Sequence, residues 1–414
     1  MIYAKLRMMI FFTAVYCHHT ASIASFDIMN TIMIQLNREN GKMSKKLKFL
    51  ISLGLSGLLC LSCFTSCNNT DNQITTESEK GSLSEETTAS SDELTSTEES
   101  TSSEKAPSQS EETGSKGLTY VVNEDGKTCT VAGLGTCKDI KIVIPFAVDG
   151  LSVTAIGARA FEGCENLVSV EIPEGIAVVE EFAFAECSSL TKITIPDSVK
   201  SIGNNAFYAC GSLQSAVIGN GVTAIGDSAF YSCFALTEIE IPDGVQSIGM
   251  NAFRYCSGLK KLVIGNGVET IGDSAFYECT SLTNVEIPDH VTSIGAYAFS
   301  QCTELESVNF GNGLKSIGNS AFNGCTKLKS VEIPDSVTTI GEWVFAMCMD
   351  LQTVTIGNGV QSIGQCVFSN CLGLSEIHYK GTQVQWKTVA KDSYWQSGAF
   401  LKNVVCSDGT IVLE

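Results

Sequence analysis

The stretch LTNVEIPDHVTSIGAYAFSQC, from Leu282 to Cys302, is one copy of a unit that fills most of this chain. Its general form is L-x-x-V-x-I-P-x-x-V-x-x-I-G-x-x-A-F-x-x-C. A fixed period of this length is the sequence signature of a solenoid, in which each repeat forms one coil. The Phe and the Cys of the unit each recur ten times at intervals of 23 residues: Phe161, Phe184, Phe207, Phe230, Phe253, Phe276, Phe299, Phe322, Phe345 and Phe368, and Cys164, Cys187, Cys210, Cys233, Cys256, Cys279, Cys302, Cys325, Cys348 and Cys371.

Each part of the unit predicts a local structure. Leu-x-x-Val-x-Ile predicts a short strand with its apolar residues inward, and the Pro-Asp or Gly-Asn-Gly that follows predicts a corner. Val-x-x-Ile-Gly predicts a second extended edge, and Ala-Phe predicts a short helical turn. Asn204, Asp227, Asp273 and Asn319 stand just before that turn, where a short polar side chain caps free amides. Because one coil cannot bury its own apolar stripe, we expect the coils to stack ~4.8 Å apart in a continuous parallel sheet.

The unit resembles the leucine-rich repeat of the BspA-like, treponemal class, which has the same Ile-Pro corner, Ile-Gly pair and Ala-Phe-x-x-Cys. The resemblance covers residues 151–379. It implies a solenoid of about ten coils with a parallel β-sheet on one face. The flanking segments resemble an amino-terminal cap at 117–150 and a carboxyl-terminal cap at 380–414. The resemblance further implies an exported, surface-exposed bacterial protein that binds other proteins and shares no catalytic residue.

One departure from the repeat bears on the role of its glycine. Glu180 stands where the Gly of the Ile-Gly pair recurs. This position therefore does not require a positive φ, and we expect the glycines to serve close packing between coils.

The corners alternate with a period of 46 residues, since Pro196, Pro242, Pro288 and Pro334 alternate with Gly219, Gly265, Gly311 and Gly357. The strand position before each corner Ile follows the same alternation. Glutamates on alternate strands lie ~9.6 Å apart, which halves their repulsion relative to glutamates on every strand. We expect a spaced acidic stripe on the sheet face that binds a protein ligand of basic character. The candidate binding face comprises Glu240, Lys261, Asn284, Glu286, Asn309, Lys329 and Glu332.

A second candidate surface is aromatic. Tyr208, Tyr231, Tyr255 and Tyr277 follow the Phe positions and predict an aromatic edge, either for binding or for ordinary edge packing.

The regular cysteines allow three interpretations. Zinc binding lacks paired C-x-x-C motifs and suitably spaced histidines. Disulfides between neighbouring coils would need Cβ atoms closer than the ~4.8 Å of a parallel stack. We therefore expect buried free thiols that pack as small hydrophobic groups. Cys129 with Cys137, and Cys366 with a cap cysteine, are the better candidates for bridges, because they lie outside the ladder.

The residues for metal binding and catalysis are few. Gly-Asn-Gly recurs as a corner but lacks the Lys and helix of a phosphate-binding loop. His290 and His378 lie about four coils apart, too far to cooperate. The corner aspartates and the strand glutamates suggest calcium, but strands ~9.6 Å apart cannot share one ion. We expect no metal, no cofactor and no enzymatic activity.

The amino-terminal region has the pattern of an export signal. Residues 43–66 contain Lys45, Lys46 and Lys48, then an apolar run, then small residues. The sequence Phe-Thr-Ser before Cys67 resembles a bacterial lipobox, and we expect lipidation at Cys67, with Cys63 and Cys60 as alternatives. Another type of cleaved signal and a retained anchor are the other possibilities, although the run is short for a span.

Two further segments lie outside the repeat. Residues 1–42 precede a complete signal, so we interpret them as a misassigned start that the mature protein lacks. Residues 67–116 are rich in Ser, Thr and Glu and predict a disordered acidic stalk. The whole chain has 26 Lys and Arg against 45 Asp and Glu, a net charge of −19. This balance excludes the basic patches that nucleic-acid binding requires.

Overall fold

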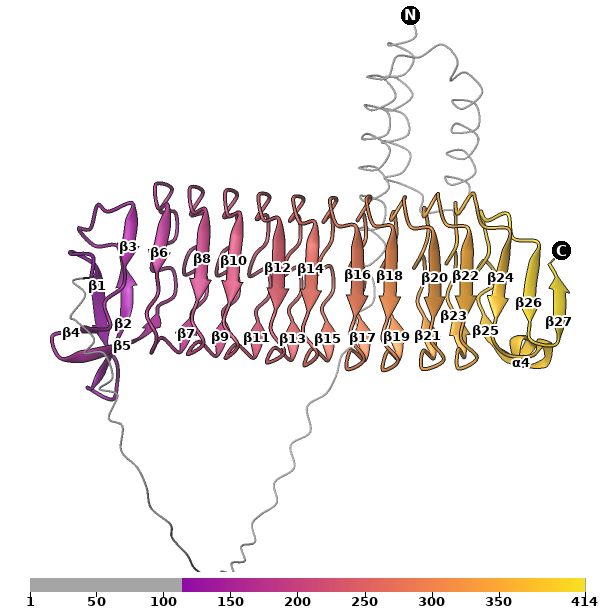
Figure 1. The fold of residues 1–414 in the computed structure, drawn as a ribbon, viewed down its shortest axis with the longest axis horizontal. Helices are drawn as coiled ribbons and strands as arrows, with labels where there is room; N and C mark the ends of the chain where they lie inside the picture. The colour runs from indigo at the N-terminus through magenta and orange to yellow at the C-terminus, as the bar shows by residue number, and fades with distance from the viewer. Residues whose placement is uncertain (1–113, 414) are drawn as a thin grey trace, which may run out of the picture. The chain divides into compact units, whose positions relative to one another are not determined.

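The computed structural model describes residues 114–413, which form one row of stacked coils (Figure 1). The expected signal at 43–66, Cys67, and the expected stalk up to residue 113 lie outside the described residues. The described chain begins three residues before the expected cap, and Ser115 already donates its N–H to the Val143 carbonyl at 2.8 Å. The predicted solenoid is confirmed.

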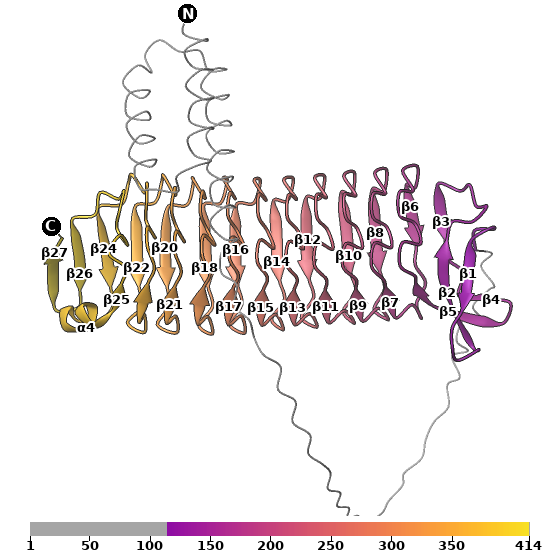
Figure 2. The same ribbon diagram turned by 180° about the vertical axis from the view of Figure 1, so that it is seen from behind.

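Each coil contributes a long strand, a corner, a short strand and a turn. In the coil that begins at Leu282, β16 (Asn284–Ile287) leads through Pro288 and Asp289 to β17 (Ser293–Ile294). The turn that follows contains Ala298 and Phe299 and returns the chain to the next long strand, β18 (Ser307–Phe310). The long strands all run in the same direction, as Figure 1 and the reverse view in Figure 2 show.

The other long strands are β3 (Lys141–Val143), β6 (Ser169–Glu171), β8 (Lys192–Ile195), β10 (Ser215–Ile218), β12 (Glu238–Ile241), β14 (Lys261–Ile264), β20 (Ser330–Ile333), β22 (Thr353–Ile356), β24 (Glu376–Tyr379) and β26 (Asn403–Cys406). The other short strands are β7 (Val178–Val179), β9 (Ser201–Ile202), β11 (Ala224–Ile225), β13 (Ser247–Ile248), β15 (Thr270–Ile271), β19 (Ser316–Ile317), β21 (Thr339–Ile340), β23 (Ser362–Ile363) and β25 (Ala390–Lys391).

The caps continue the stack at both ends. The amino-terminal cap contains β1 (Thr119–Val122), β2 (Thr128–Gly133) and β4 (Ala147–Val148) besides β3, and β5 (Leu151–Ile156) begins the repeat array. The carboxyl-terminal cap contains α4 (Gln383–Thr388) and β27 (Gly409–Val412), which pairs antiparallel with β26. The expected array of about ten coils therefore extends into both caps, because β2 pairs with β5 and β25 pairs with β23.

The coils are joined by two ladders of strands. The short strands belong to one 14-stranded sheet that runs the length of the described chain. The long strands divide into a 6-stranded sheet from β3 to β14 and a 7-stranded sheet from β16 to β27. The long strands therefore form the expected parallel sheet, but the expectation that it is continuous was wrong, because pairing stops between β14 and β16. The expected second extended edge is itself a paired ladder.

The segment around Ala-Phe forms stacked turns, so the expectation of a short helical turn there was wrong. Tyr208 donates to the Asn205 carbonyl three residues back, but Phe207 and Ala209 donate to the next coil. Two residues of each turn have positive φ, as in Asn205 (57°) and Ala209 (56°), and these angles interrupt a helix. Hydrogen bonds between coils thus replace hydrogen bonds within a helix.

The polar residues before the turn do not cap their own coil. Asp227 accepts a hydrogen bond at 2.7 Å from the N–H of Met250, 23 residues later. Asn204 accepts in the same way from Asp227, at 2.8 Å. These side chains therefore join neighbouring coils instead of capping a helical turn.

Glycine allows the coils to approach closely. The Gly of the Ile-Gly pair has no positive φ, and a Cβ on Gly203 would lie 2.6 Å from the carbonyl carbon of Glu180. The expectation that these glycines serve close packing is confirmed.

The Gly corners explain the 46-residue period. A Cβ on Gly219 would lie 2.5 Å from the Pro196 carbonyl carbon, and a Cβ on Gly221 would lie 1.8 Å from the Asp197 oxygen. The N–H of Asn220 donates to Asp197 Oδ1 at 2.7 Å. Each Gly-Asn-Gly corner therefore packs directly against the Pro-Asp corner of the preceding coil.

This packing predicts that two Gly→Ala substitutions differ in their effect on the free energy of unfolding. Gly267→Ala would place a Cβ 1.9 Å from the Asp243 carbonyl oxygen, whereas Gly211→Ala would place one 3.6 Å from the Phe234 ring. We expect Gly267→Ala to lower the free energy of unfolding by about 1–3 kcal/mol through overpacking. Gly211→Ala should change it by less than about 0.5 kcal/mol. Equilibrium urea unfolding measures both; equal stability of the two variants would contradict the corner packing.

Identical residues stack inside the coils. The ten Phe rings of the repeat are fully buried, and neighbouring rings are nearly parallel with centroids 5.0–6.0 Å apart. The ladder cysteines from Cys187 to Cys371 are also fully buried. Each of their Sγ–H groups donates to the carbonyl of the Phe 26 residues earlier, at 3.0–3.3 Å.

All fourteen cysteines in the described chain are free thiols, in agreement with the interpretation of the ladder. Cys129, Cys137, Cys366 and Cys406 are free as well, so the structure contains neither of the bridges considered for the caps. Burial raises the pKa of Cys210, Cys302 and Cys371 to about 12. These thiols therefore stay protonated far above neutral pH.

Thiol reactivity in the native protein should follow burial. Because the thiolate is the reactive form and the folded-state pKa is raised, we expect Cys210 and Cys302 to resist iodoacetamide at pH 8. Cys164 and Cys366, which are only half-buried, should be alkylated first. After denaturation without reductant, all of these cysteines should react. Peptide-resolved mass spectrometry measures the labelling, and disulfide-linked ladder peptides from the native protein would contradict the free-thiol ladder.

Candidate functional site

The long strands present one exposed face. In β12, β14 and β16 the first and third residues are exposed, and the second and fourth are buried. The buried positions are apolar in every coil, whereas the exposed positions change between charged, polar and apolar residues from coil to coil. We call this exposed surface of the long strands the sheet face.

The structure places the seven candidate binding residues together on or beside the sheet face. Exposed positions of the long strands hold six of them: Glu240 in β12, Lys261 in β14, Asn284 and Glu286 in β16, Asn309 in β18 and Glu332 in β20. Lys329 immediately precedes β20. In the ladder, Glu240 lies opposite Val263, Glu286 opposite Asn309, and Glu332 opposite Thr355.

Two adjoining depressions hollow the sheet face. The larger has a volume of about 830 Å³ and is lined by residues of β14, β16 and β18. The smaller, of about 350 Å³, lies between β18 and β20, and the two share Asn309 and Phe310. Five of the seven candidate residues line them, whereas Glu240 and Lys329 do not. We call this pair of depressions the sheet-face groove; its polar and aromatic lining includes Lys260, Lys261, Asn284, Glu286, Asn309, Phe310, Glu332 and Lys380.

Three of these lining residues were not predicted from the sequence: Lys260, Phe310 and Lys380. Phe310 occupies the position at the end of the long strand where Ile recurs in most coils, so its departure from the repeat was a usable signal. Its ring is only partly buried and meets the Phe322 ring edge-on at 5.6 Å between centroids. Phe310 is the aromatic residue shared by both halves of the groove.

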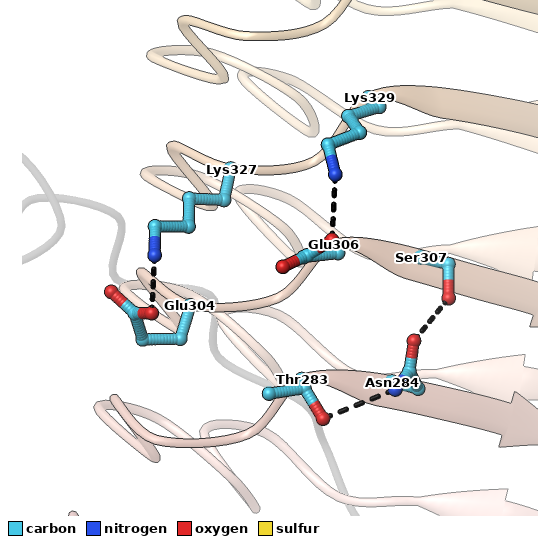
Figure 3. Close-up of polar contacts among 7 residues, drawn as sticks. All are labelled: Thr283, Asn284, Glu304, Glu306, Ser307, Lys327 and Lys329. Carbon is cyan, nitrogen blue, oxygen red and sulfur yellow. Dashed lines mark hydrogen bonds and ion pairs between the residues drawn. The ribbon is translucent and has the colours of Figure 1, made fainter.

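Ion pairs reduce the acidic character of the expected stripe. Lys380 Nζ lies 2.8 Å from Glu332 Oε1, although the two residues are 48 positions apart. Lys329 Nζ lies 2.6 Å from Glu306 Oε2, and this contact lowers the pKa of Glu306 (Figure 3). Within the described chain, Glu240 and Glu286 are the stripe glutamates without an ion pair.

Asn284 has partners in its own coil and in the next. The Ser307 hydroxyl donates to Asn284 Oδ1 at 2.6 Å, and Asn284 Nδ2 donates to Thr283 Oγ1 at 3.1 Å (Figure 3). Asn284, which lines the larger depression, is therefore held in place by hydrogen bonds.

The corner aspartates accept hydrogen bonds from the neighbouring coil. Asp243, Asp289 and Asp335 each accept the N–H of the corner Asn in the next coil, at 2.7–2.9 Å. Within residues 114–413 no group of three or more His, Cys, Asp or Glu side chains could hold a metal ion. His378 Nε2 lies 3.2 Å from Glu376 Oε1, and His290 is in a corner four coils away, so the two do not form a shared site.

The four tyrosines form a continuous edge. Tyr208 and Tyr231 stack with centroids 4.9 Å apart, while Tyr255 meets Tyr231 and Tyr277 edge-on at 5.3 and 5.8 Å. The guanidinium of Arg254 lies 4.5 Å from the Tyr277 ring centroid and 4.8 Å from that of Tyr255. Several ring faces are thus covered by one another or by Arg254, which favours edge packing over stacking on a ligand.

These features define a leucine-rich-repeat solenoid with an exposed, variable sheet face. The profile of the BspA type leucine rich repeat region matches residues 140–260 and 269–393 in six copies. The chain belongs to this family, and the resemblance seen in the repeat is confirmed. Repeat folds of this kind are typically binding scaffolds. No helix of the described residues is long and apolar enough to cross a membrane.

Solved structures of bacterial leucine-rich-repeat proteins are similar to this chain. A protein from Bacteroides ovatus is 34% identical, with 63% of this chain and 69% of that chain covered and a TM-score of 0.57. A protein from T. pallidum is 29% identical, with 51% and 88% covered and a TM-score of 0.41. A leucine rich cell surface protein from Faecalibacterium prausnitzii is 28% identical, with 67% and 97% covered and a TM-score of 0.36. Comparison with curated proteins finds no match.

Proposed function

We propose that this chain is an exported surface protein whose solenoid binds a protein ligand at the sheet-face groove and so mediates adhesion or another protein–protein contact. The observation that carries the proposal is the groove itself, a hollow on the one large surface whose exposed residues vary while the buried ones stay apolar. Phe310 supplies an aromatic contact at its centre, and Asn284 and Asn309 supply amide groups around it. A central apolar contact with a polar surround is the usual anatomy of a protein interface.

The charges favour a ligand with basic groups. Glu240 and Glu286 are exposed and have no ion pair among the described residues, and the Glu332–Lys380 pair is exposed and open to exchange. Exposed charges steer association and are screened over ~8 Å at physiological ionic strength. Binding should therefore weaken as salt rises. We propose a binding role and no catalytic role.

The test uses a partner captured from host matrix proteins by the protein expressed from Met43. Glu240→Gln/Glu286→Gln should lower its affinity about three- to tenfold at low salt, because each exposed charge contact contributes about 0.2–1 kcal/mol. Phe310→Ile should also weaken binding while preserving the fold, because most other coils have Ile there. Affinity is measured by surface plasmon resonance at two salt concentrations.

Glu181→Gln/Glu186→Gln is the matched control, because it removes the same charge from exposed positions at the turns. This control should bind like the parent. Loss of binding in the control, or unchanged binding in both Glu240→Gln/Glu286→Gln and Phe310→Ile, would remove the sheet face and its groove from the mechanism and direct attention to the tyrosine edge.

The second candidate function is carbohydrate binding or a purely structural role in the cell envelope. The tyrosine edge is the surface most suited to a sugar, but Tyr208 and Tyr231 already stack on each other. A glycan array with the same protein separates this function from protein binding.

We further propose that a lipid at Cys67 anchors the protein to the membrane. The support is the order of basic residues, apolar run and lipobox-like segment before this cysteine. Attached lipid adds about 0.8 kcal/mol of membrane affinity per buried methylene, so acylation decides where the protein partitions.

Expressed from Met43 in a bacterial host, the protein should enter the detergent phase and incorporate labelled fatty acid. Cys67→Ala should lose both properties. Labelling that persists in Cys67→Ala would move the modification to Cys63 or Cys60, and an unlabelled parent protein would contradict the anchor.

A further inference from the structure

The long strands pair in twos. Pairing extends over all four residues between β8 and β10, β12 and β14, β16 and β18, and β20 and β22. It is reduced to one residue pair between β10 and β12 and between β18 and β20. Between β14 and β16 it is absent, and these two strands end separate sheets. We call the boundary between β14 and β16 the seam.

The hydrogen bonds that lead into the long strands show the same alternation. Within pairs, the N–H of Lys260 donates to Thr237 and that of Glu306 donates to Thr283, both at 2.8 Å. Between pairs, the N–H of Thr237 donates to Gln214 and that of Lys329 donates to Glu306, both at 3.4 Å. At the seam, no such bond joins Thr283 to Lys260.

The corners explain why each coil with a Pro corner pairs with the coil after it and not with the coil before it. A Gly corner packs against the Pro corner before it, as Gly265 does against Pro242, where a Cβ would lie 2.5 Å from the Pro carbonyl carbon. The Pro corner that follows has no N–H to donate back to the Gly coil, as at Pro288. Each Pro coil is therefore bound tightly to the next coil and loosely to the previous one.

The loss of pairing at the seam is confined to the long strands. On the other ladder, Thr270 pairs with Ser293 and Ile271 with Ile294 across the same boundary. In the turns, Ser274 donates to Ala296 at 2.7 Å and Phe276 to Ala298 at 2.8 Å. Coils that are bonded through the short strands and turns but not through the long strands can bend at the sheet face without separating.

Charged side chains hold the boundary between β18 and β20 but not the seam. Glu304 pairs with Lys327 and Glu306 with Lys329 across the former (Figure 3). The equivalent positions at the seam are Gly258 with Ser281 and Lys260 with Thr283, which carry no opposite charges. The β10/β12 boundary also lacks opposite charges at these positions, with Ser212 and Ala235 and with Gln214 and Thr237, and it keeps one residue pair. The ion pairs are therefore an added contact at the β18/β20 boundary that the seam does not have.

We propose that the seam is a built-in hinge that sets the width of the sheet-face groove. Lys260 and Lys261 line the larger depression from one side of the seam, and Asn284 and Glu286 line it from the other. Bending about the continuous short-strand ladder moves these two walls relative to each other. The hinge is a property of the free protein and goes beyond the proposed function. Its test therefore needs no ligand.

Hydrogen–deuterium exchange resolved to single amides tests the hinge on the full chain. The Thr283 amide should exchange at least about tenfold faster than the Lys260 and Glu306 amides at the equivalent positions, after correction for intrinsic rates, because it lacks their bond. The short-strand amides across the same boundary should be as protected as those elsewhere. Equal protection of Thr283, Lys260 and Glu306 would overturn the proposal.

A charge placed across the seam should close it. Thr283→Glu sets a carboxylate beside Lys260, as Glu306 stands beside Lys329, and should slow exchange at residue 283 about threefold or more relative to the neutral Thr283→Gln. Conversely, Glu304→Gln/Glu306→Gln should speed exchange of the Lys329 amide at the β18/β20 boundary. If Thr283→Glu and Thr283→Gln exchange alike while the β18/β20 variant is also unchanged, ion pairs do not control these boundaries and the hinge is contradicted.

Discussion

Each coil must place its backbone within hydrogen-bonding reach of the next coil, and the rest of the structure depends on this spacing. Parallel strands meet at ~4.8 Å, so any side chain inside the stack faces a copy of itself at nearly that distance. Flat Phe rings fit at this separation, which is why they stack face to face with centroids near 5 Å. A Cβ at Gly203 or Gly265 does not fit, because the neighbouring backbone already occupies its place. The same stacking buries the ladder cysteines from Cys187 to Cys371 completely, and each of these thiols donates to the carbonyl of a ladder Phe, as Cys256 does to Phe230.

Much of the fold could be predicted because these constraints recur in every coil. Phe253 and Cys256 lie where the period places them, and Glu180 correctly indicated that the recurring Gly does not need a positive φ. The positive φ angles instead fall at residues such as Asn205 and Ala209, where residue identity varies from coil to coil and gives no signal. These angles are imposed by hydrogen bonds to the next coil, which a single repeat does not reveal. For the same reason the turn was mistaken for a helical one.

The candidate site was predicted less completely than the fold. Side-chain direction along a strand is fixed by alternation, so Glu240, Glu286 and Asn309 could be placed on one face from the sequence alone. The Lys380–Glu332 pair could not, because it joins residues two coils apart through a flexible side chain. The depressions around Phe310 are lined by residues from several coils, and which side chains meet there becomes visible only when the coils are stacked. The repeat thus defines the surface, and departures from the repeat shape it.

The nesting of each Gly corner on the preceding Pro corner also constrains how such an array can change in length. Removing one coil from the alternating region would bring two corners of the same kind together, and the bond from a corner Asn to the preceding Asp would be lost at that point. Removing two coils would join a Gly corner to a Pro corner again, and every remaining contact would find its usual neighbour. Recombination between copies of this gene segment should therefore be tolerated best in steps of two repeats. Each step would change the length of the stack by about 9.6 Å and keep the alternation of Pro and Gly coils along its surface.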